Sequence, residues 1–215
     1  MIYLNPIARG EIKLNIFIQM ILAYLLGSIP SGVWIGKLLY KKDIRDYGSG
    51  NTGATNTFRI LGPKAGTIAL IGDVLKGTIA TLIPIWFNTD IHPMFIGVFA
   101  IIGHVFPLYI KFKGGKAVAT SAGVALALHP IFLLIFLGVF LLILFTTSMV
   151  SVSSMLAVSL AAVGTLFLND PVFSIAIWVI AILIVYLHRE NIKRLRTGTE
   201  SKVPFGFNSS KKDKK

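Results

Sequence analysis

The sequence has no cysteine, and this absence removes several kinds of chemistry together. A chain without thiols forms no disulfide, builds no thiolate metal site and has no cysteine nucleophile, and its redox compartment stays undetermined. Histidine is also scarce, and His104 has no second His, Asp or Glu at metal-ligand spacing, which favours a hydrogen-bonded core residue over a ligand. The sequence therefore predicts no metal and no cofactor.

Acidic residues are few: 9 Asp and Glu stand against 21 Lys and Arg, which gives a formal net charge of +12. All charged residues together make up 14% of the chain, while 54% of it is hydrophobic. The basic residues border apolar runs and do not form an aromatic-interleaved patch, so we expect no nucleic-acid partner. Composition instead predicts an all-α integral membrane protein.

Three familiar signatures of phosphate or acyl chemistry are missing as well. No glycine cluster continues as Gly-Lys followed by Ser or Thr, so a Walker-type nucleotide site is not expected. No His is followed five residues later by Asp, the arrangement of the thioester-dependent glycerolipid acyltransferases. No Gly-x-Ser-x-Gly elbow of the serine hydrolases appears either.

Long apolar runs separated by polar turns predict the membrane topology. Residues 117–145 allow either one kinked helix or two short helices that meet at His129-Pro130. A break there places all but three of the Lys and Arg residues on one face, and a cytoplasmic excess of these residues normally fixes orientation. The exceptions are Arg9, Lys13 and Lys76. The break is therefore favoured, with the N-terminus outside and the C-terminus in the cytoplasm.

With this break the chain has seven transmembrane or membrane-embedded helices. Their expected ranges are 15–40, 63–87, 94–112, 116–128, 131–146, 151–168 and 171–187. Segment 116–128 is too short to cross a bilayer of ~30 Å at about 1.5 Å per residue, so we expect it to be re-entrant or partly unwound. Residues 1–14 form a polar lead, residues 1–200 one membrane-embedded domain, and residues 201–215 a polar, disordered tail.

Two glycine clusters lie on the predicted basic face. The first, residues 48–59, has three glycines in six residues and ends in Arg59; converging backbone N–H groups with Ser, Thr and Asn donors suit a phosphate. An ordinary flexible connector is the alternative. The second cluster is Gly114-Gly115-Lys116. Both contribute hydrogen-bond donors and positive charge.

Other polar groups interrupt the apolar runs. A small-residue patch, residues 27–32, breaks the first span, which a membrane tolerates where neighbours satisfy the freed carbonyls. Asp73 and Lys76 lie on one helical face, and a local ion pair is favoured over a functional role. A serine-rich turn, residues 146–154, either caps a helix or supplies hydroxyls to a site. Together with His188-Arg189-Glu190-Asn191, these donors favour a phosphorylated anion as ligand.

Four of these motifs, in this order, resemble the motif set of a known family. They are Gly27-Ser28-Ile29-Pro30-Ser31-Gly32, Gly48-Ser49-Gly50-Asn51-Thr52-Gly53-Ala54-Thr55-Asn56, Gly103-His104 with Phe112-Lys113-Gly114-Gly115-Lys116, and His188-Arg189-Glu190-Asn191-Ile192. The chain is similar, from about residue 16 to 200, to the bacterial acyl-phosphate-dependent glycerol-3-phosphate acyltransferases, the PlsY family. In that family Gly usually follows Gly-Gly-Lys, where this chain has Ala117.

The resemblance implies a multi-pass enzyme of the bacterial cytoplasmic (inner) membrane, with its active site at the cytoplasmic face. It implies transfer of an acyl group from acyl phosphate to glycerol 3-phosphate, which gives lysophosphatidic acid and phosphate for phospholipid biosynthesis, with membrane lipid as the surroundings. Acyl phosphate is already activated, so no covalent nucleophile is required. The acceptor's own phosphate is expected to take the hydroxyl proton.

The resemblance also assigns site residues. Catalytic roles are expected for Ser49, Lys116, His188 and Asn191. Substrate-binding roles are expected for Gly48, Gly50, Asn51, Gly53, Ala54, Thr55, Asn56, Arg59, Gly114, Gly115 and Ser154, although Ser151 and Ser153 lie close to Ser154. The alternative is a transporter or binding protein for a phosphorylated anion, but transporters commonly contain inverted repeats and this sequence has none.

Overall fold

The computed structural model describes residues 6–209, and over this range it contains helices and no strand. The chain divides into two compact units, Met1–Leu128 and His129–Lys215, here called unit 1 and unit 2. The boundary falls where the sequence predicts a break, because helix α5 ends at Leu128 and helix α6 begins at Pro130. Proline suits the first turn of a helix, where its missing N–H has no intrahelical partner.

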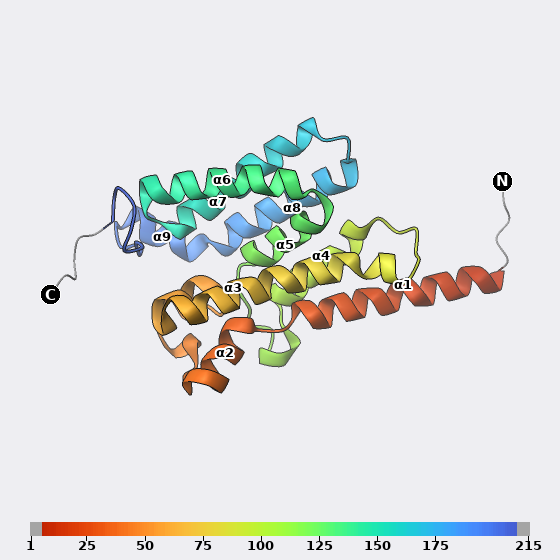
Figure 1. The fold of residues 1–215 in the computed structure, drawn as a ribbon, viewed down its shortest axis with the longest axis horizontal. Coiled ribbons are helices and arrows are strands. Elements are labelled where there is room, and N and C mark those ends of the chain that lie inside the picture. Colours follow the sequence, from red (N-terminus) through yellow and green to blue (C-terminus); the bar gives the residue numbers. More distant parts are fainter. Residues whose placement is uncertain (1–5, 210–215) are drawn as a thin grey trace. The chain divides into compact units, whose positions relative to one another are not determined.

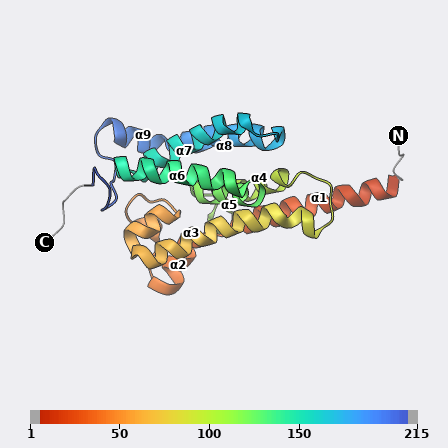
Figure 2. The same cartoon turned by 45° about the horizontal axis from the view of Figure 1, so that its top comes forward.

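Helix α3 is central to unit 1 and contacts each of the other four α-helices of that unit (Figures 1 and 2). The helices of unit 1 are α1 Pro6–Gly27, α2 Ser31–Tyr40, α3 Ala54–Trp86, α4 Pro93–Val105 and α5 Val118–Leu128, with short 3₁₀ turns η1 Ile44–Asp46 and η2 Leu108–Ile110. Small residues let these helices approach closely: a side chain at Gly77 would collide with Thr120 of α5.

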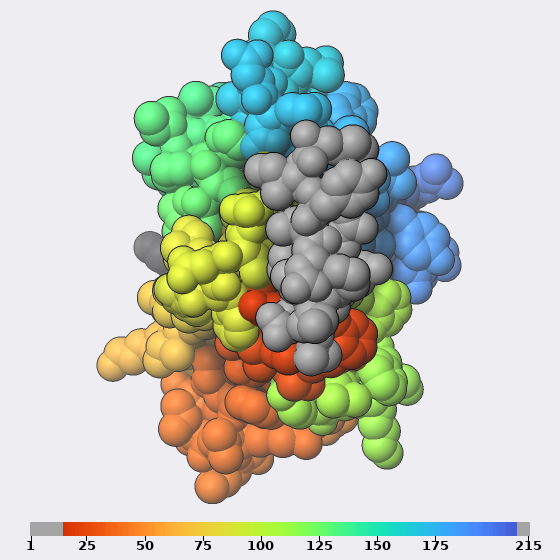
Figure 3. All heavy atoms as spheres, turned by 90° about the vertical axis from the view of Figure 1, so that its right-hand side faces the viewer, coloured from red at the N-terminus to blue at the C-terminus, as the bar shows by residue number. Residues whose placement is uncertain are grey.

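The first helix is broken as the small-residue patch predicts. Helices α1 and α2 meet at an angle of 46° across a break of a few residues. The carbonyl of Ile29 in the break accepts a hydrogen bond of 2.7 Å from Lys76 Nζ. In the middle of α1, Gln19 Nε2 donates to Thr89 Oγ1 at 3.1 Å, where the α3–α4 connection lies beside α1 (Figure 3).

Helix α3 begins earlier than the sequence predicts. The expected span starts at residue 63, but α3 starts at Ala54, and only Gly62 leaves the helical conformation, with φ +84°. This conformation suits glycine because it has no Cβ, and Pro63 then restarts the helix. Residues 54–61 therefore form a separate helical piece, so that Arg59 lies on a helix and not in a loop.

Over residues 129–209, unit 2 contains four α-helices and a 3₁₀ turn. They are α6 Pro130–Thr147, α7 Val150–Gly164, η3 Thr165–Phe167, α8 Pro171–Leu187 and α9 Arg189–Arg196. Helix α7 contacts both α6 and α8 (Figure 1). At one end of the unit Asp170 Oδ1 accepts from Phe173 N, and Asp170 Oδ2 lies 2.9 Å from His129 Nε2. One carboxylate thus caps α8 and ties its start to the start of α6.

Among the described residues four helices are long and apolar enough to cross a membrane, and the number of spans rises to as many as six if each bent pair counts as one. The bent pairs are α1 with α2, from residue 15 on, and α8 with α9. The predicted count of seven is thus met only in part. The remaining segment, α5, has 11 residues, in line with the expectation that 116–128 is too short for a regular span. Helix α6 is apolar all round, as suits a lipid-facing helix.

The structure at both ends of the chain differs from the predicted polar N-terminal segment and disordered C-terminal tail. Helix α1 begins at Pro6, inside the predicted polar lead, and residues 1–5 lie outside the described residues. In the predicted disordered tail, Val203 N donates to Ser148 O and Phe207 N to Phe145 O, both at 2.8 Å. Residues 201–209 therefore pack onto the ends of α6 and α7, while the prediction for 210–215 falls outside the described residues.

Candidate active site

The glycine cluster of unit 1 is organised by Asn56. This side chain is 1% exposed, and its Nδ2 donates to Ile44 O, Tyr47 O and Asn51 O over 2.8–3.2 Å. Its Oδ1 accepts from Ser49 N at 3.0 Å. The amide of Asn56 thus holds the backbone of the loop in place, and its predicted contact with substrate stays a prediction.

Glycine is required within this loop. Gly48 and Gly50 have φ of +62° and +68°, and a side chain at Gly48 would meet Asn56 Oδ1 at 2.5 Å. Asn51 Oδ1 accepts from Gly53 N at 3.0 Å, a local turn that ends where α3 begins. The loop thereby presents Ser49 at the surface.

The chain that enters the loop is fixed by an ion pair. Arg45 Nε and Nη2 donate to both oxygens of Asp43, at 2.9 and 2.6 Å. The hydrogen-bonded guanidinium of Arg45 holds the pKa of Asp43 well below its usual range, although burial opposes the shift. This bidentate pair is the strong form of a surface ion pair, so it anchors η1 just before the loop.

The second cluster, Gly114-Gly115-Lys116, runs back along the end of α4. Gly114 N donates to Val105 O at 3.2 Å and Gly115 N to His104 O at 3.1 Å. Side chains at either glycine would collide with His104, so this approach needs glycine. Ala117 follows with φ +57°, a conformation that costs a non-glycine residue roughly 1–2 kcal/mol.

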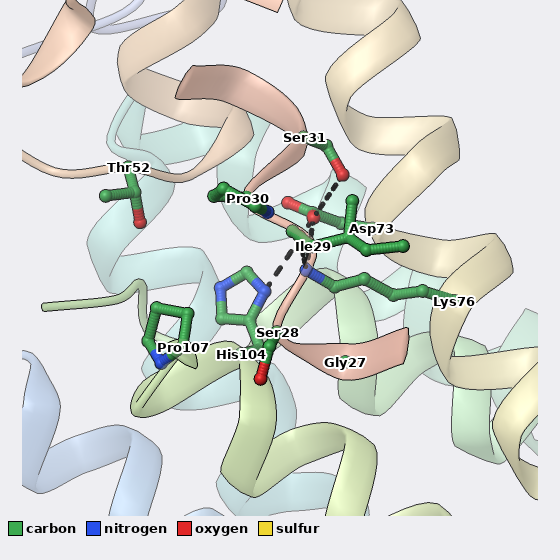
Figure 4. A pocket seen from close by; sticks show the side chains of 10 residues that line it. All are labelled: Gly27, Ser28, Ile29, Pro30, Ser31, Thr52, Asp73, Lys76, His104 and Pro107. Carbon is green, nitrogen blue, oxygen red and sulfur yellow. Dashed lines mark hydrogen bonds and ion pairs between the residues drawn. The ribbon is translucent and has the colours of Figure 1, made fainter. Parts of the chain in front are cut away.

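Unit 1 brings its two clusters to one region. Thr52 of the glycine loop lines the same small pocket as His104 (Figure 4). Gly115 packs directly on the His104 ring. The segments that carry Ser49 and Lys116 therefore approach each other at this pocket, while a shared site for Ser49, Arg59 and Lys116 stays a prediction. Lys116 is half-buried and Arg59 is exposed.

Unit 2 carries the other predicted site residues, and Glu200 joins the elements that hold them. Glu200 Oε1 accepts from Ser151 Oγ of α7 and from Asn191 Nδ2 of α9, each at 2.7 Å. Its Oε2 accepts from Arg194 Nε at 2.8 Å. The start of α7 and the helix α9 are thus adjacent. Ser154 lies three residues after Ser151 on α7 and therefore on the same face.

The carboxyl of Glu200 is held in its ionised form by the groups that surround it. Burial alone would raise its pKa, but the hydrogen bonds from Ser151, Asn191 and Arg194 outweigh burial, so the pKa of Glu200 lies below its ordinary value. Glu200 was missed as a site residue. A lone acid near the start of a basic tail gives no sequence signal that three donors surround it.

The hydrogen bonds also distinguish the three serines near the start of α7 from one another. Ser151 donates to Glu200, and Ser153 Oγ donates to Met149 O at 2.9 Å. Both hydroxyls therefore serve the fold, whereas Ser154 is the candidate that the sequence favours for substrate.

His188 stands at the bend of 53° between α8 and α9 and is 3% exposed. Its Nδ1 lies 2.7 Å from Ile184 O. A carbonyl only accepts, so Nδ1 carries the proton, and Nε2 accepts in the neutral ring and donates in the protonated one. This ring can therefore bind either a hydroxyl or a phosphate oxygen.

The polar cluster of each unit is rich in hydrogen-bond donors, and among the side chains described, those of residues 15–209, no three from His, Asp or Glu are placed to hold a metal ion. The apolar helices and these clusters define a helical integral membrane protein suited to a phosphorylated ligand.

Comparison with known proteins agrees with this class. A family model described as glycerol-3-phosphate acyltransferase matches residues 17–198. The chain is 50% identical over 212 residues to the glycerol-3-phosphate acyltransferase of Lactococcus lactis subsp. lactis (strain IL1403), which covers 94% of this chain and 100% of the relative. It is 52% identical over 193 residues to that of Listeria monocytogenes serotype 4a (strain HCC23), covering 88% and 98%.

Solved structures show the same fold. The crystal structure of PlsY (YgiH), an integral membrane glycerol 3-phosphate acyltransferase, in its glycerol 3-phosphate form matches with a TM-score of 0.82 and 41% identity, covering 87% of this chain and 94% of that one. The lysophosphatidic acid form matches with a TM-score of 0.79 and 40% identity, covering 86% and 94%. The chain belongs to the glycerol-3-phosphate acyltransferase family.

Proposed function

We propose that the chain transfers an acyl group from acyl phosphate to glycerol 3-phosphate. The bond between the acyl carbon and the phosphate oxygen of the donor breaks, and an ester bond between the acyl carbon and a hydroxyl oxygen of glycerol 3-phosphate forms. The hydroxyl proton passes to the phosphate group of glycerol 3-phosphate and from there to the released phosphate. The products are lysophosphatidic acid and inorganic phosphate. The related PlsY was crystallised in a glycerol 3-phosphate form and in a lysophosphatidic acid form, which supports glycerol 3-phosphate as the acceptor and lysophosphatidic acid as the product.

The observation that carries the choice of donor is a site rich in hydrogen-bond donors in a chain without cysteine. Acyl phosphate has a good leaving group, so positioning and electrostatic stabilisation suffice. In this proposal the glycine loop with Ser49 holds the acyl phosphate, and Arg59 and Lys116 offset phosphate charge. His188, Asn191 and Ser154 orient the acceptor.

The donor is tested with purified protein in detergent. With an acyl phosphate and glycerol 3-phosphate we expect phosphate release and lysophosphatidic acid in equal amounts. With acyl-CoA or acyl carrier protein as the only donor we expect no product, because no paired His and Asp is present to activate the hydroxyl against a poorer leaving group. Comparable turnover with acyl-CoA would reject the proposed donor.

We also propose that the N-terminus lies outside and the site faces the cytoplasm of a bacterial inner membrane, from the distribution of Lys and Arg. Because the chain has no cysteine, single cysteines report without background. Asn88→Cys and Asn169→Cys should label in intact cells, and Lys42→Cys and Lys202→Cys only after permeabilisation, since all four positions are exposed. If residue 169 is protected together with residue 42, this topology is wrong.

A further inference from the structure

A buried polar cluster in unit 1 has no part in the transfer as proposed. It comprises Asp73 and Lys76 of α3 and His104 of α4, whose side chains are 3%, 4% and 7% exposed. Lys76 Nζ lies 2.8 Å from Asp73 Oδ1 and donates to Ile29 O in the α1–α2 break. Ser31 Oγ donates to the same Asp73 oxygen at 3.0 Å (Figure 4). The ion pair thus stabilises the break between α1 and α2, because its lysine donates to the carbonyl of Ile29 that the break leaves without a helical partner.

The break does not account for His104. Its Nδ1 lies 3.0 Å from Thr120 Oγ1 of α5 and 3.7 Å from Asp73 Oδ1. The shorter contact is a hydrogen bond, and the longer one is too long to be one, so Asp73 acts on the ring by charge alone. An apolar side chain would fill this site without the cost of burying a polar ring. Packing alone therefore does not explain why a histidine that bonds to Thr120 occupies this position.

The reason lies in the neighbours of Lys116. Before it, Gly115 donates its N–H to the carbonyl of His104 and packs so closely on the ring that a side chain there would collide with Nε2. After it, Thr120 lies in the first turn of α5, which begins at Val118. His104 thus contacts the chain on both sides of Lys116. Its carbonyl and the Nε2 side of its ring meet Gly115, and its Nδ1 meets Thr120.

We propose that His104 is a positioning residue for Lys116, held in its orientation by Thr120 and by the buried Asp73–Lys76 pair. His104 fixes the chain on either side of Lys116, so that the ammonium group is presented in a set place. This inference rests on the proposed function only for the contact of Lys116 with a substrate phosphate. A shift of about 1 Å in a charged donor is enough to slow a reaction strongly.

The direct test removes the Thr120 hydroxyl without changing the shape of the side chain. In the ligand-free protein, Thr120→Val should speed hydrogen exchange of the amides at residues 114–116 by at least about threefold, because their support is loosened. Turnover should fall about three- to tenfold, the size expected for one lost neutral hydrogen bond. The matched control is Thr81→Val: Thr81 is also fully buried, but it donates only to Gly77 O of its own helix, at 2.8 Å.

A double-mutant cycle separates positioning from a general effect on the fold. If His104 and Thr120 act through Lys116, Thr120→Val should cause no further loss of turnover or of glycerol 3-phosphate affinity in a Lys116→Gln background. Full additivity of the two substitutions would overturn the inference. Unchanged exchange at residues 114–116, or the same change in Thr81→Val, would overturn it as well. The exchange measurement needs no substrate, so it decides the matter even if the proposed donor fails.

Discussion

Replacing Glu200 with alanine should destabilise the protein by about 3 kcal/mol and lower turnover at least about tenfold. The carboxylate is 5% exposed and accepts from Ser151, Asn191 and Arg194, so its removal leaves three polar groups without their acceptor. Turnover falls with stability because the amide of Asn191, a proposed substrate contact, loses the partner that orients it. Thermal unfolding in detergent and phosphate release measure the two effects.

A matched acidic residue provides the control. Glu190 is also on the C-terminal part of the chain, but its side chain is 59% exposed and pairs only with Lys193, itself 72% exposed. Such pairs contribute about 0–1 kcal/mol, so Glu190→Ala should leave stability and turnover close to wild type. Equal effects of the two substitutions would show that Glu200 does not join α7 to α9.

The same residue predicts an acid sensitivity with a definite sign. The pKa of Glu200 is lowered from its ordinary value of 4.5 in the folded protein. Its contribution to stability is therefore fully present above pH 4.5 and is lost as the pH falls through the lowered value. A Glu200→Gln variant has no carboxylate to protonate at this position, so its stability, measured by thermal unfolding, should change less than that of the wild type over this acidic range.

The break between the two units could be predicted because two signals agree. His129-Pro130 interrupts an apolar run locally, and the count of Lys and Arg over the whole chain favours a reversal there. The structure places the end of α5 and the start of α6 at these residues. A proline or glycine next to an apolar run is a signal between sequence neighbours, which is why most helix ends in the chain were predicted within a few residues.

The glycine loop and Glu200 show where such reasoning stops. The sequence predicts a loop as far as Arg59, whereas α3 begins at Ala54. Its first helical piece is separated from the long one only by Gly62, which takes a positive φ. The four contacts of Asn56 to the backbone of the loop are likewise not encoded in any local pattern. Glu200 meets Ser151, 49 residues away, and no local pattern encodes that contact.

Replacing Lys116 or Arg59 with alanine should lower turnover at least about tenfold while leaving thermal stability near that of the wild type. Each substitution removes a charged hydrogen-bond donor from a site that we propose binds phosphate, where such a bond contributes roughly 1.5–3 kcal/mol. Arg59→Lys should not restore full activity, because a guanidinium can bind two phosphate oxygens together and an ammonium cannot. Turnover at saturating and limiting substrate gives the measurement.

Lys113→Ala is the matched control for charge. Lys113 lies three residues before Lys116 and is exposed, so its removal changes the net charge equally without touching the proposed phosphate contact. Its effect should be limited to a small, salt-dependent change at low substrate concentration, as expected for a distant surface charge. If Lys113→Ala and Lys116→Ala lower turnover by the same factor at saturating substrate, overall charge and not a placed donor explains both. In that case the Gly114-Gly115-Lys116 turn is not part of the phosphate site, although the fold that presents it would be unaffected.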